Sequence, residues 1–247
     1  MNNLLLSPIN VIEETNFSNS WVKAIKFCSK YGQPVVFGDR KDPKNAKDST
    51  QLISLTGNAI KEIENKEIHP RFPFKQVGQY CREFERDYLE KYLKKPDNQK
   101  FVYLYFERLV NYDCMREGGI VDQLSILKSQ LTEQIESRIM SNRSKAITWY
   151  PDVDLHSNSP PCLSEIQVRY IGDQQVDVHW HFRSRDLISA WMANIIALTE
   201  CINREVIWPN NCQIARIVDY SDSLHIYDHM QNVVRDLEFV PITQWGR

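Results

Sequence analysis

Residues 164–182 read Ser-Glu-Ile-Gln-Val-Arg-Tyr-Ile-Gly-Asp-Gln-Gln-Val-Asp-Val-His-Trp-His-Phe, and this stretch decides the fold. Apolar and polar residues alternate on both sides of Gly172-Asp173, which predicts two strands, at 164–170 and 174–182, joined by a hairpin turn. Strands joined by so short a turn run antiparallel. The chain therefore contains antiparallel strand pairing.

Further elements lie on both sides of this hairpin. β-Branched and aromatic residues predict short strands at residues 146–149, 214–218 and 224–227. Apolar residues at helical spacing predict helices at residues 76–93, 121–139 and 187–201. Residues 40–50 are charged and rich in turn formers, which predicts a surface loop. Helices mixed with antiparallel strands favour an α+β fold over a repeated βαβ unit.

Composition limits the class of protein. The chain has 247 residues, of which 42% are hydrophobic and 25% charged, as in ordinary globular proteins. No segment differs enough in composition to mark a boundary, so we predict one domain over residues 1–247. The net charge of −2 and a pI of about 6.3 give no overall basic field for nucleic acid. No apolar run is long enough to predict a membrane span.

The six cysteines are scattered without a Cys-x-x-Cys pair. The apolar run at residues 4–6 ends at once in Ser7-Pro8, so it does not form the core of a secretory signal. We therefore expect reduced thiols and a cytoplasmic protein. His179-x-His181 has no cysteine or acidic pair to complete a set of ligands, so we expect no metal.

Cys162 is the main candidate for catalysis, because it follows Pro160-Pro161 and each proline restricts the backbone. About twenty residues later comes Arg183-Ser184-Arg185-Asp186, which supplies a guanidinium, a hydroxyl and a carboxylate close together. A guanidinium can bind phosphate and can stabilise a thiolate. We predict covalent catalysis by Cys162 on a phosphorylated substrate. The alternative is a buried structural cysteine.

Three further sites carry candidate binding groups. Asn194 lies among apolar residues of a predicted helix, and a buried amide must find partners, so it could read a base. His225-x-Tyr227 places two polar side chains on one face of a strand. Arg143 precedes a strand and could bind an anion. The alternatives are a solvated or capping asparagine, a packed histidine and tyrosine, and an exposed arginine.

In this order the motifs resemble those of the thymidylate synthase family. The run Phe-Val-Tyr-Leu-Tyr-Phe-Glu-Arg-Leu at 101–109, the Pro-Pro-Cys-Leu and the Phe-Arg-Ser-Arg-Asp are most similar to its archaeal-type branch. The resemblance is clear over residues 70–230 and vague in the N-terminal third. The matching motifs are Tyr105 with Glu107-Arg108-Leu109, Asp122-Gln123, Arg143, Trp149-x-Pro151-x-x-Asp154, Pro160-Pro161-Cys162, Arg183-Ser184-x-Asp186, Asn194 and His225-x-Tyr227.

The resemblance implies an α+β fold with a bent, mostly antiparallel sheet packed with helices, and a homodimer whose sheets lie back to back. It implies that Cys162 adds to C6 of dUMP, a pyrimidine nucleoside monophosphate. It implies that 5,10-methylenetetrahydrofolate, a reduced folate, supplies the one-carbon unit, which gives the 5-methyl product. Tyr105 would help to remove the C5 proton through water.

The resemblance also implies roles at the phosphate and at the catalytic acid. Arg183 and Ser184 would hold the phosphate, and Arg143 would reach the phosphate in the partner subunit. For the family's catalytic glutamate we choose Glu85, because on a helical wheel of residues 76–93 it lies closest to the apolar stripe. Its alternatives are Glu83 and Asp87.

At the base and sugar, the resemblance implies that Asn194 hydrogen-bonds the uracil and that Asp186 lies near the base and the folate ring. His225 and Tyr227 would hold the 3′-hydroxyl of the sugar. Phe106 stands where the family usually has a glycine, and no tryptophan-rich folate loop lies between Glu85 and Tyr105, so the folate side departs from the family pattern.

Two other functions remain open. One is a pyrimidine nucleoside monophosphate hydroxymethylase acting on dUMP, UMP, dCMP or CMP, in which water rather than hydride completes the reaction. An amide at Asn194 can serve uracil, whereas an aspartate there would favour cytosine. The other is a nucleotide-binding homologue with reduced activity, which would not need to keep Cys162, Arg183 and the polar pair at 225 and 227.

Overall fold

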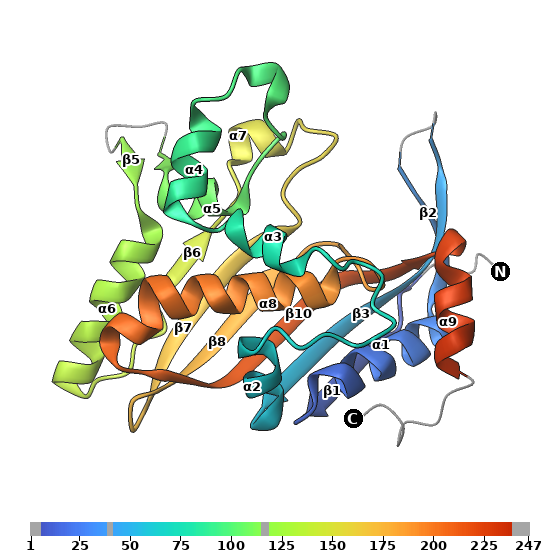
Figure 1. Ribbon diagram of the computed structural model, residues 1–247, viewed down its shortest axis with the longest axis horizontal. Coiled ribbons are helices and arrows are strands. Elements are labelled where there is room, and N and C mark those ends of the chain that lie inside the picture. Colours follow the sequence, from blue (N-terminus) through green and yellow to red (C-terminus); the bar gives the residue numbers. More distant parts are fainter. Residues whose placement is uncertain (1–5, 39–41, 115–118, 239–247) are drawn as a thin grey trace.

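The computed structural model describes residues 6–38, 42–114 and 119–238 (Figure 1). The strands are β1 (Ile9–Glu14), β2 (Gln33–Phe37), β3 (Lys44–Thr56), β4 (Tyr112–Asp113), β5 (Ile120–Val121), β6 (Lys145–Ile147), β7 (Leu163–Gly172), β8 (Gln175–Phe182), β9 (Arg185–Asp186) and β10 (Gln213–Tyr227). The helices are α1 (Phe17–Tyr31), α2 (Asn58–Glu64), α3 (Val77–Arg82), α4 (Arg86–Leu93), α5 (Tyr105–Val110), α6 (Gln123–Ser137), α7 (Pro151–Asp154), α8 (Trp191–Ile202) and α9 (Gln231–Glu238).

The main sheet has the strand order β1-β3-β10-β8-β7-β6, with β2 beside β3 and β9 beside β10. Antiparallel pairs join β3 to β2 and β10, and join β7 to β6 and β8. Parallel pairs join β1 to β3 and β10 to β8 and β9. The predicted α+β fold with a mostly antiparallel sheet is confirmed.

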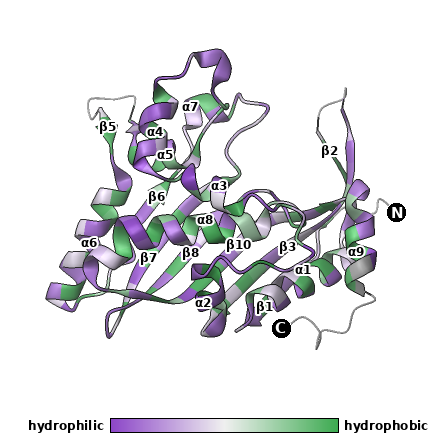
Figure 2. Cartoon of the chain, viewed as in Figure 1, coloured by the Kyte–Doolittle hydropathy of each residue, from purple (hydrophilic) through white to green (hydrophobic). Residues whose placement is uncertain are grey.

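Helices α1, α2 and α8 lie over the sheet in Figure 1, and α8 contacts both α2 and α3. Figure 2 shows both hydrophobic and hydrophilic residues along α1 and α6, as expected of helices with one buried face. Helix α8 is buried along almost its whole length, and Trp21, Trp180 and Trp191 fill the core around it. Within the described residues, no helix combines the length and apolar character needed to cross a membrane.

The predicted hairpin is confirmed, with its turn one residue later than expected. Asp173 and Gln174 both have positive φ, of 48° and 55°, which is the backbone of a two-residue type I′ turn. Gly172 precedes them with φ 98° and pairs with Gln175. Because this turn matches the natural twist of paired strands, it fixes the register of β7 against β8.

The two short strands predicted at residues 214–218 and 224–227 are one long strand, β10. Its pairing with β3 shifts between Ser221 and Leu224, so two polar residues there form a bulge. The loop predicted at residues 40–50 is also wrong from Lys44 onward, because strand β3 begins there. Residues 40 and 41 lie outside the described residues. The polar segment that begins at Lys44 forms a strand because it pairs with both β2 and β10.

The helix predicted at residues 76–93 is broken into α3 and α4. The backbone N–H groups of Glu83, Phe84 and Glu85 each bond three residues back, which tightens the end of α3. Glu85 has extended backbone angles and precedes α4. The guanidinium of Arg204 donates to the carbonyl oxygen of Phe84, which removes an acceptor that a continuous helix would use. The helix predicted at 121–139 is confirmed with shorter ends, and the helix predicted at 187–201 is confirmed but begins at Trp191 and ends at Ile202.

Candidate active site

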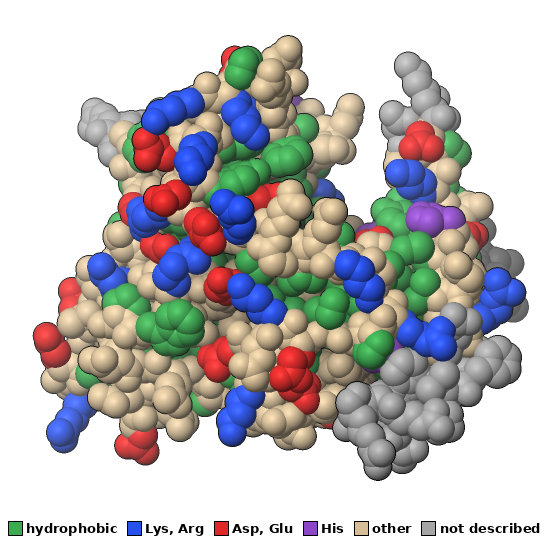
Figure 3. All heavy atoms as spheres, in the orientation of Figure 1, with side chains coloured by type: hydrophobic (Ala, Val, Ile, Leu, Met, Phe, Trp, Pro, Cys, Tyr) green, Lys and Arg blue, Asp and Glu red, His purple; other side chains and the backbone are tan. Residues whose placement is uncertain are grey.

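A cavity of about 730 Å³ lies beside the sheet, where several of the predicted motifs meet. In the space-filling view, hydrophobic side chains gather near the middle of one face of the molecule (Figure 3). The cavity volume is in the range of small-molecule sites. The cavity is lined by Phe74, Tyr80, Glu83, Phe84, residues 101–106, Ser159, Cys162, residues 184–186, Ser189, Ala190, Ala193, Asn194, His225 and Tyr227.

Cys162 lies at this cavity with its loop held by Arg183. The guanidinium of Arg183 donates from Nε to the carbonyl oxygen of Pro161, at 2.9 Å, and from Nη2 to that of Pro160, at 2.7 Å. Nη2 is also 3.9 Å from Sγ of Cys162. The backbone N–H of Arg183 donates to the carbonyl oxygen of Cys162, at 2.9 Å. The arginine predicted to bind phosphate therefore also positions the thiol and places positive charge beside it.

Two tyrosines lie next to Cys162. The hydroxyl of Tyr103 contacts both Cys162 and the hydroxyl of Tyr105. The backbone N–H of Leu163 donates to the hydroxyl of Tyr105, at 3.4 Å. Burial, together with the neighbouring Cys162, raises the pKa of both tyrosines, and that of Tyr105 is well above its usual value. Both therefore keep their protons at neutral pH and can donate hydrogen bonds or relay protons.

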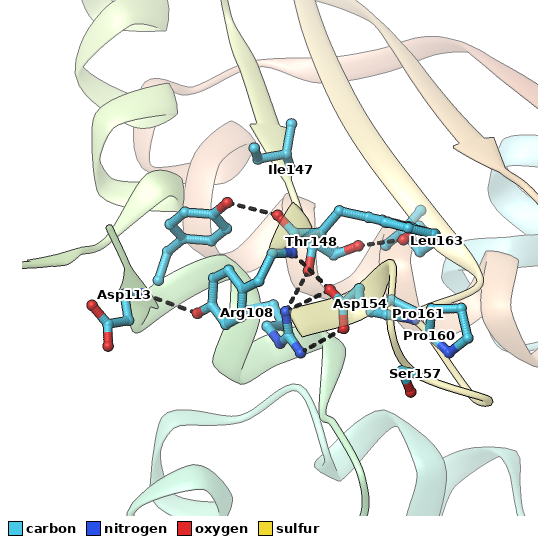
Figure 4. A network of polar contacts seen from close by, with 12 residues as sticks. Arg108, Asp113, Ile147, Thr148, Asp154, Ser157, Pro160, Pro161 and Leu163 are labelled. Carbon is cyan, nitrogen blue, oxygen red and sulfur yellow. Dashed lines mark hydrogen bonds and ion pairs between the residues drawn. The ribbon is translucent and has the colours of Figure 1, made fainter. Parts of the chain in front are cut away.

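A buried ion pair supports the chain that leads to the cysteine (Figure 4). Arg108 and Asp154 form a bidentate pair with N–O distances of 2.9 and 3.2 Å, and Arg108 also donates to the carbonyl oxygen of Thr148. The guanidinium stacks on the ring of Tyr150, 3.7 Å from its centroid. The hydroxyl of Thr148 donates to the carbonyl oxygen of Leu163. This network links α5 and α7 to the residue that follows Cys162.

The Arg-Ser-x-Asp motif divides between the cavity and the core. Ser184 and Asp186 line the cavity, and one carboxylate oxygen of Asp186 accepts from the backbone N–H groups of Ile188 and Ser189. Arg185 also touches the cavity, but Nη2 of its buried guanidinium binds the carboxylate of Asp219. The aspartate is thus held at a fixed position at the edge of the cavity, beside Ser184.

Asn194 and the His225–Tyr227 pair approach the cavity from α8 and β10. Nδ2 of Asn194 donates to the hydroxyl of Tyr80, at 2.9 Å, which leaves its second N–H and its oxygen for a ligand. The ring of His225 lies 4.8 Å from that of Tyr227 and 4.7 Å from that of Phe37. Burial lowers the pKa of His225, so its imidazole is neutral at pH 7.

The three candidates for the catalytic glutamate lie in different places. Glu83 lines the cavity, and burial raises the pKa of its carboxyl group. Glu85 is absent from the described lining and lies at the start of α4, and Asp87 is exposed in the first turn of that helix. The helical wheel favoured Glu85 because it treated residues 76–93 as one continuous helix. The chain breaks between α3 and α4, and Glu83 is the acid that lines the cavity.

Comparison with known proteins decides the family. The family model of thymidylate synthase matches residues 74–242, which is most of the chain and includes every motif at the cavity. The chain belongs to the thymidylate synthase family. The resemblance inferred from the sequence is therefore confirmed at the level of the family.

The chain is similar to archaeal relatives that are named, provisionally, as thymidylate synthases. It is 29% identical to the protein of Methanopyrus kandleri over 56% of this chain and 61% of the relative. It is 31% identical to that of Methanothermobacter thermautotrophicus over 57% and 59%, and 28% identical to that of Methanocaldococcus jannaschii over 80% and 87%. The matched part is thus less than two thirds of the length of the first two relatives.

Arg143 lies apart from the cavity. It is exposed, bonds Ser141, and lines a separate surface hollow beside α6. Its contact with a phosphate across a subunit interface stays a prediction. Among the described residues, no group of histidine, cysteine and acidic side chains is arranged to hold a metal ion.

Sequence reasoning missed several residues of this site. Tyr103 stands two positions before Tyr105, and that alternation was the available signal. Tyr80 lay in the predicted helix at residues 76–93 and was given no role. Phe37 and Asp48 lie in the N-terminal third, far in sequence from any motif, so only strand pairing brings them to His225.

The lining of the cavity combines aromatic and polar side chains. Its lining is mainly apolar toward α3 and residues 101–106, where Phe74, Phe84, Phe101 and Phe106 contribute rings. A flat, bicyclic pterin suits such a surface, because aromatic rings favour stacked and edge contacts. Polar groups of the same lining lie close to these rings: Asn194 bonds Tyr80, whose ring lies 5.6 Å from that of Phe84.

Proposed function

We propose that this protein methylates C5 of dUMP with 5,10-methylenetetrahydrofolate, through a covalent adduct on Cys162. The observation that carries the proposal is the position of the Cys162 thiol. It lies 3.9 Å from the Arg183 guanidinium and next to Tyr103, at the edge of a cavity that also holds groups for a base and a sugar. A thiolate in such a place can serve as a nucleophile.

The thiolate adds to C6 of the uracil, and the electrons of the C5–C6 double bond move toward O4. This forms the Sγ–C6 bond and makes C5 nucleophilic. After C5 has gained its substituent and lost its proton, the Sγ–C6 bond breaks and the double bond returns. Covalent addition thus divides a difficult substitution into easier steps. Tyr103 and Tyr105, protonated at neutral pH, would guide the departing C5 proton through water.

Glu83 is the acid that we assign to the uracil oxygen, in place of Glu85. Burial raises the pKa of its carboxyl group, so a larger fraction keeps its proton near neutral pH than in water. A protonated carboxyl can donate to O4 as negative charge develops there. Asn194 would bind the uracil edge with its free N–H and oxygen, and Ser184 with Arg183 would bind the phosphate.

The reduced folate would be held by the aromatic lining at Phe84 and Phe101, with Asp186 near its ring. When bound, it supplies a one-carbon unit and a hydride. The residues of the chain orient the two ligands and exclude water from the space between them. Exclusion of water matters, because water at the exocyclic carbon would give a hydroxymethyl rather than a methyl product.

Release of tritium from [5-³H]-dUMP in the presence of methylenetetrahydrofolate tests this proposal. We expect release by the natural protein and none by Cys162→Ala. The Cys114→Ala variant, which removes another partly exposed thiol, is the matched control and should retain the activity. Absence of release despite measurable binding of dUMP would contradict the proposal.

The same assay with UMP, dCMP and CMP, followed by the mass of the product, distinguishes the hydroxymethylase alternative. A product heavier than the methyl nucleotide by one oxygen would establish hydroxymethylation. Binding without release for all four nucleotides would favour a homologue with reduced activity.

We also propose that the protein acts as a homodimer. Two observations support this. Arg143 is exposed and lies outside the cavity that its family role would require it to serve. Side chains of β7 and β10 also alternate between buried and half-exposed, so the sheet has a face that is only partly covered.

Mixing two inactive variants tests the dimer. If Arg143 serves the partner's site, a mixed dimer of Cys162→Ala and Arg143→Ala contains one site with both residues intact. We expect activity to reappear on mixing. No recovery, together with a monomer in sedimentation, would contradict the proposed dimer.

A further inference from the structure

A chain of polar side chains connects the N-terminal third to His225. Asp48 on β3 is the direct register partner of His225 on β10. Directly opposed residues of antiparallel strands project from the same face. Both side chains are buried, with 6% and 4% of their surface exposed. On its other side, His225 is the register partner of Asp186 on β9, so the imidazole lies in a row between two carboxylates.

The link from Asp48 to His225 passes through Ser223. The hydroxyl of Ser223 donates to Oδ1 of Asp48, at 2.6 Å, and lies 3.3 Å from Nδ1 of His225. Ser223 belongs to the bulge in β10, and Thr50 fixes that bulge by donating to the carbonyl oxygen of Asp222, at 2.8 Å. Bulges redirect side chains next to active sites, and this one turns Ser223 toward Asp48.

The hydrogen-bonding protons of Asp48, Ser223 and His225 can be counted. An ionised carboxylate only accepts hydrogen bonds, and Asp48 accepts one from Ser7 and one from Ser223. The single hydroxyl proton of Ser223 is therefore used, so toward His225 its oxygen can only accept. Nδ1 of His225 must then carry the proton. In a neutral imidazole this leaves Nε2 without a proton, as an acceptor.

Nε2 of His225 has no hydrogen-bond partner within the described part of the chain, although it is buried and its residue lines the cavity. A buried acceptor without a partner is costly, so a ligand that donates a proton there is favoured. The rings of Phe37 and Tyr227 flank the imidazole and restrict its rotation. The carboxylates of Asp186 and Asp48 and the backbone of Ser223 raise the pKa of His225, but burial outweighs them and keeps the ring neutral.

We propose that Asp48, acting through Ser223, is a positioning residue that locks His225 in its Nδ1–H tautomer, so that Nε2 selects a ligand with a hydroxyl hydrogen. In the nucleotide this hydroxyl is the 3′-hydroxyl. That identification rests on the proposed function, whereas the tautomer lock does not. A ligand with a fluorine in place of this hydroxyl has similar size but no hydrogen to donate, and it leaves Nε2 unpaired.

Long-range ¹H–¹⁵N NMR of the ligand-free, ¹⁵N-labelled protein at pH 7.5 tests the lock directly. The signals of His225 are identified by their loss in His225→Gln. We expect the Nδ1–H pattern in the natural protein. In Ser223→Ala the hydroxyl that accepts from Nδ1–H is lost and only the backbone contact of residue 223 remains. In Asp48→Asn the amide can donate to Ser223, whose hydroxyl can then donate to Nδ1. Both variants should therefore gain the Nε2–H form. An Nε2–H pattern in the natural protein, or an unchanged Nδ1–H pattern in both variants, would overturn the lock.

Asp222→Asn is the matched control for these spectra. Its carboxylate lies on the same strand but contacts Nε2 of His181, at 2.7 Å. This variant should change the signals of His181 and leave those of His225 unchanged. A change at His225 of the same size as in Asp48→Asn would show a general effect of charge rather than a lock, and would overturn the proposal.

Affinities for dUMP and its 3′-fluoro analogue test the selection. In the natural protein we expect the analogue to bind at least about tenfold more weakly. In Asp48→Asn the difference should shrink, because Nε2–H can donate to either ligand. Equal affinities in the natural protein, with the Nδ1–H pattern present, would overturn the selection and the assignment of the sugar while the lock stands. If dUMP is not the substrate, the tritium assay shows no release, whatever the tautomer of His225 and whatever the two affinities prove to be.

Discussion

The two walls of the cavity are built in different ways. The wall formed by β9 and β10 is polar, and strand register and hydrogen bonds fix its groups, as between Asp48, His225 and Asp186. The wall formed by α3, α5 and the segment between α4 and α5 is mainly aromatic, and contacts between rings such as Phe84 and Phe106 hold it together.

This difference indicates a division of work. Hydrogen-bonding groups at fixed positions suit a nucleotide, which presents donors and acceptors in a set pattern. A wall of packed rings suits a flat ligand that is recognised by the apolar area it buries rather than by a pattern of hydrogen-bond donors and acceptors. Changes in the first wall should therefore affect nucleotide binding, and changes in the second should affect the folate, with Glu83 as the exception.

The exchange of Glu83 for glutamine should have the largest effect. The amide cannot transfer a proton to O4, so we expect kcat to fall by about 10²–10⁴, the usual contribution of a general acid. Glu85→Gln, the matched control, should lie within a fewfold of the natural protein. Steady-state kinetics with both substrates measure this, and a larger loss in Glu85→Gln would return the assignment to that residue.

Arg108→Met should lower the free energy of unfolding, because it breaks the buried ion pair between Arg108 and Asp154. This change leaves Asp154 buried without its partner, which costs about 3–5 kcal/mol in the free energy of unfolding. Lys145→Met breaks the exposed ion pair with Glu165 and should cost about 0–1 kcal/mol. Denaturant unfolding compares the two, and equal losses would show that the buried network does not support the fold.

On the polar wall, Arg183→Ala should raise the dissociation constant of dUMP by more than about tenfold, because a charge-assisted contact with the phosphate is lost. Arg169→Ala, on β7, is the control. Calorimetric titration gives both values. Unchanged affinity in Arg183→Ala would restrict this arginine to its contacts with Pro160, Pro161 and Cys162.

On the aromatic wall, Phe101→Ala should raise the KM for methylenetetrahydrofolate about three- to tenfold, as expected for the loss of one ring contact of about 0.5–1.5 kcal/mol. The dissociation constant of dUMP should stay the same. Ile126→Ala, another exposed apolar residue but outside the cavity, is the control. A change confined to dUMP binding would reverse the division between the walls.

The sequence predicted the polar wall better than the aromatic one. Three short motifs have residues that lie together along the chain, so local patterns reveal them: Pro160-Pro161-Cys162, Ser184 with Asp186, and His225 with Tyr227. Glu83 was named only as an alternative to Glu85, because the break after α3 depends on Arg204, which lies far away in the sequence. Asp48 was missed because long-range pairing makes β3 from a polar segment that resembles a loop.

The boundaries of β10 show the same limit. Asp222 and Ser223 interrupt the apolar pattern, which predicted two strands, yet pairing with β3 continues on both sides of the bulge. The hairpin at β7 and β8 was predictable because all its information is local. The prediction of one domain over residues 1–247 stays a prediction.

The central claim is that the Cys162 thiol attacks C6 of a uracil nucleotide. Mass spectrometry of the protein after incubation with 5-fluoro-dUMP and methylenetetrahydrofolate tests this attack. Fluorine replaces the hydrogen on C5, so no proton can leave C5 and the covalent adduct accumulates. We expect one nucleotide bound per chain, on the peptide that contains Cys162, and no adduct in Cys162→Ala. An adduct on another residue, or none while 5-fluoro-dUMP binds, would contradict the claim.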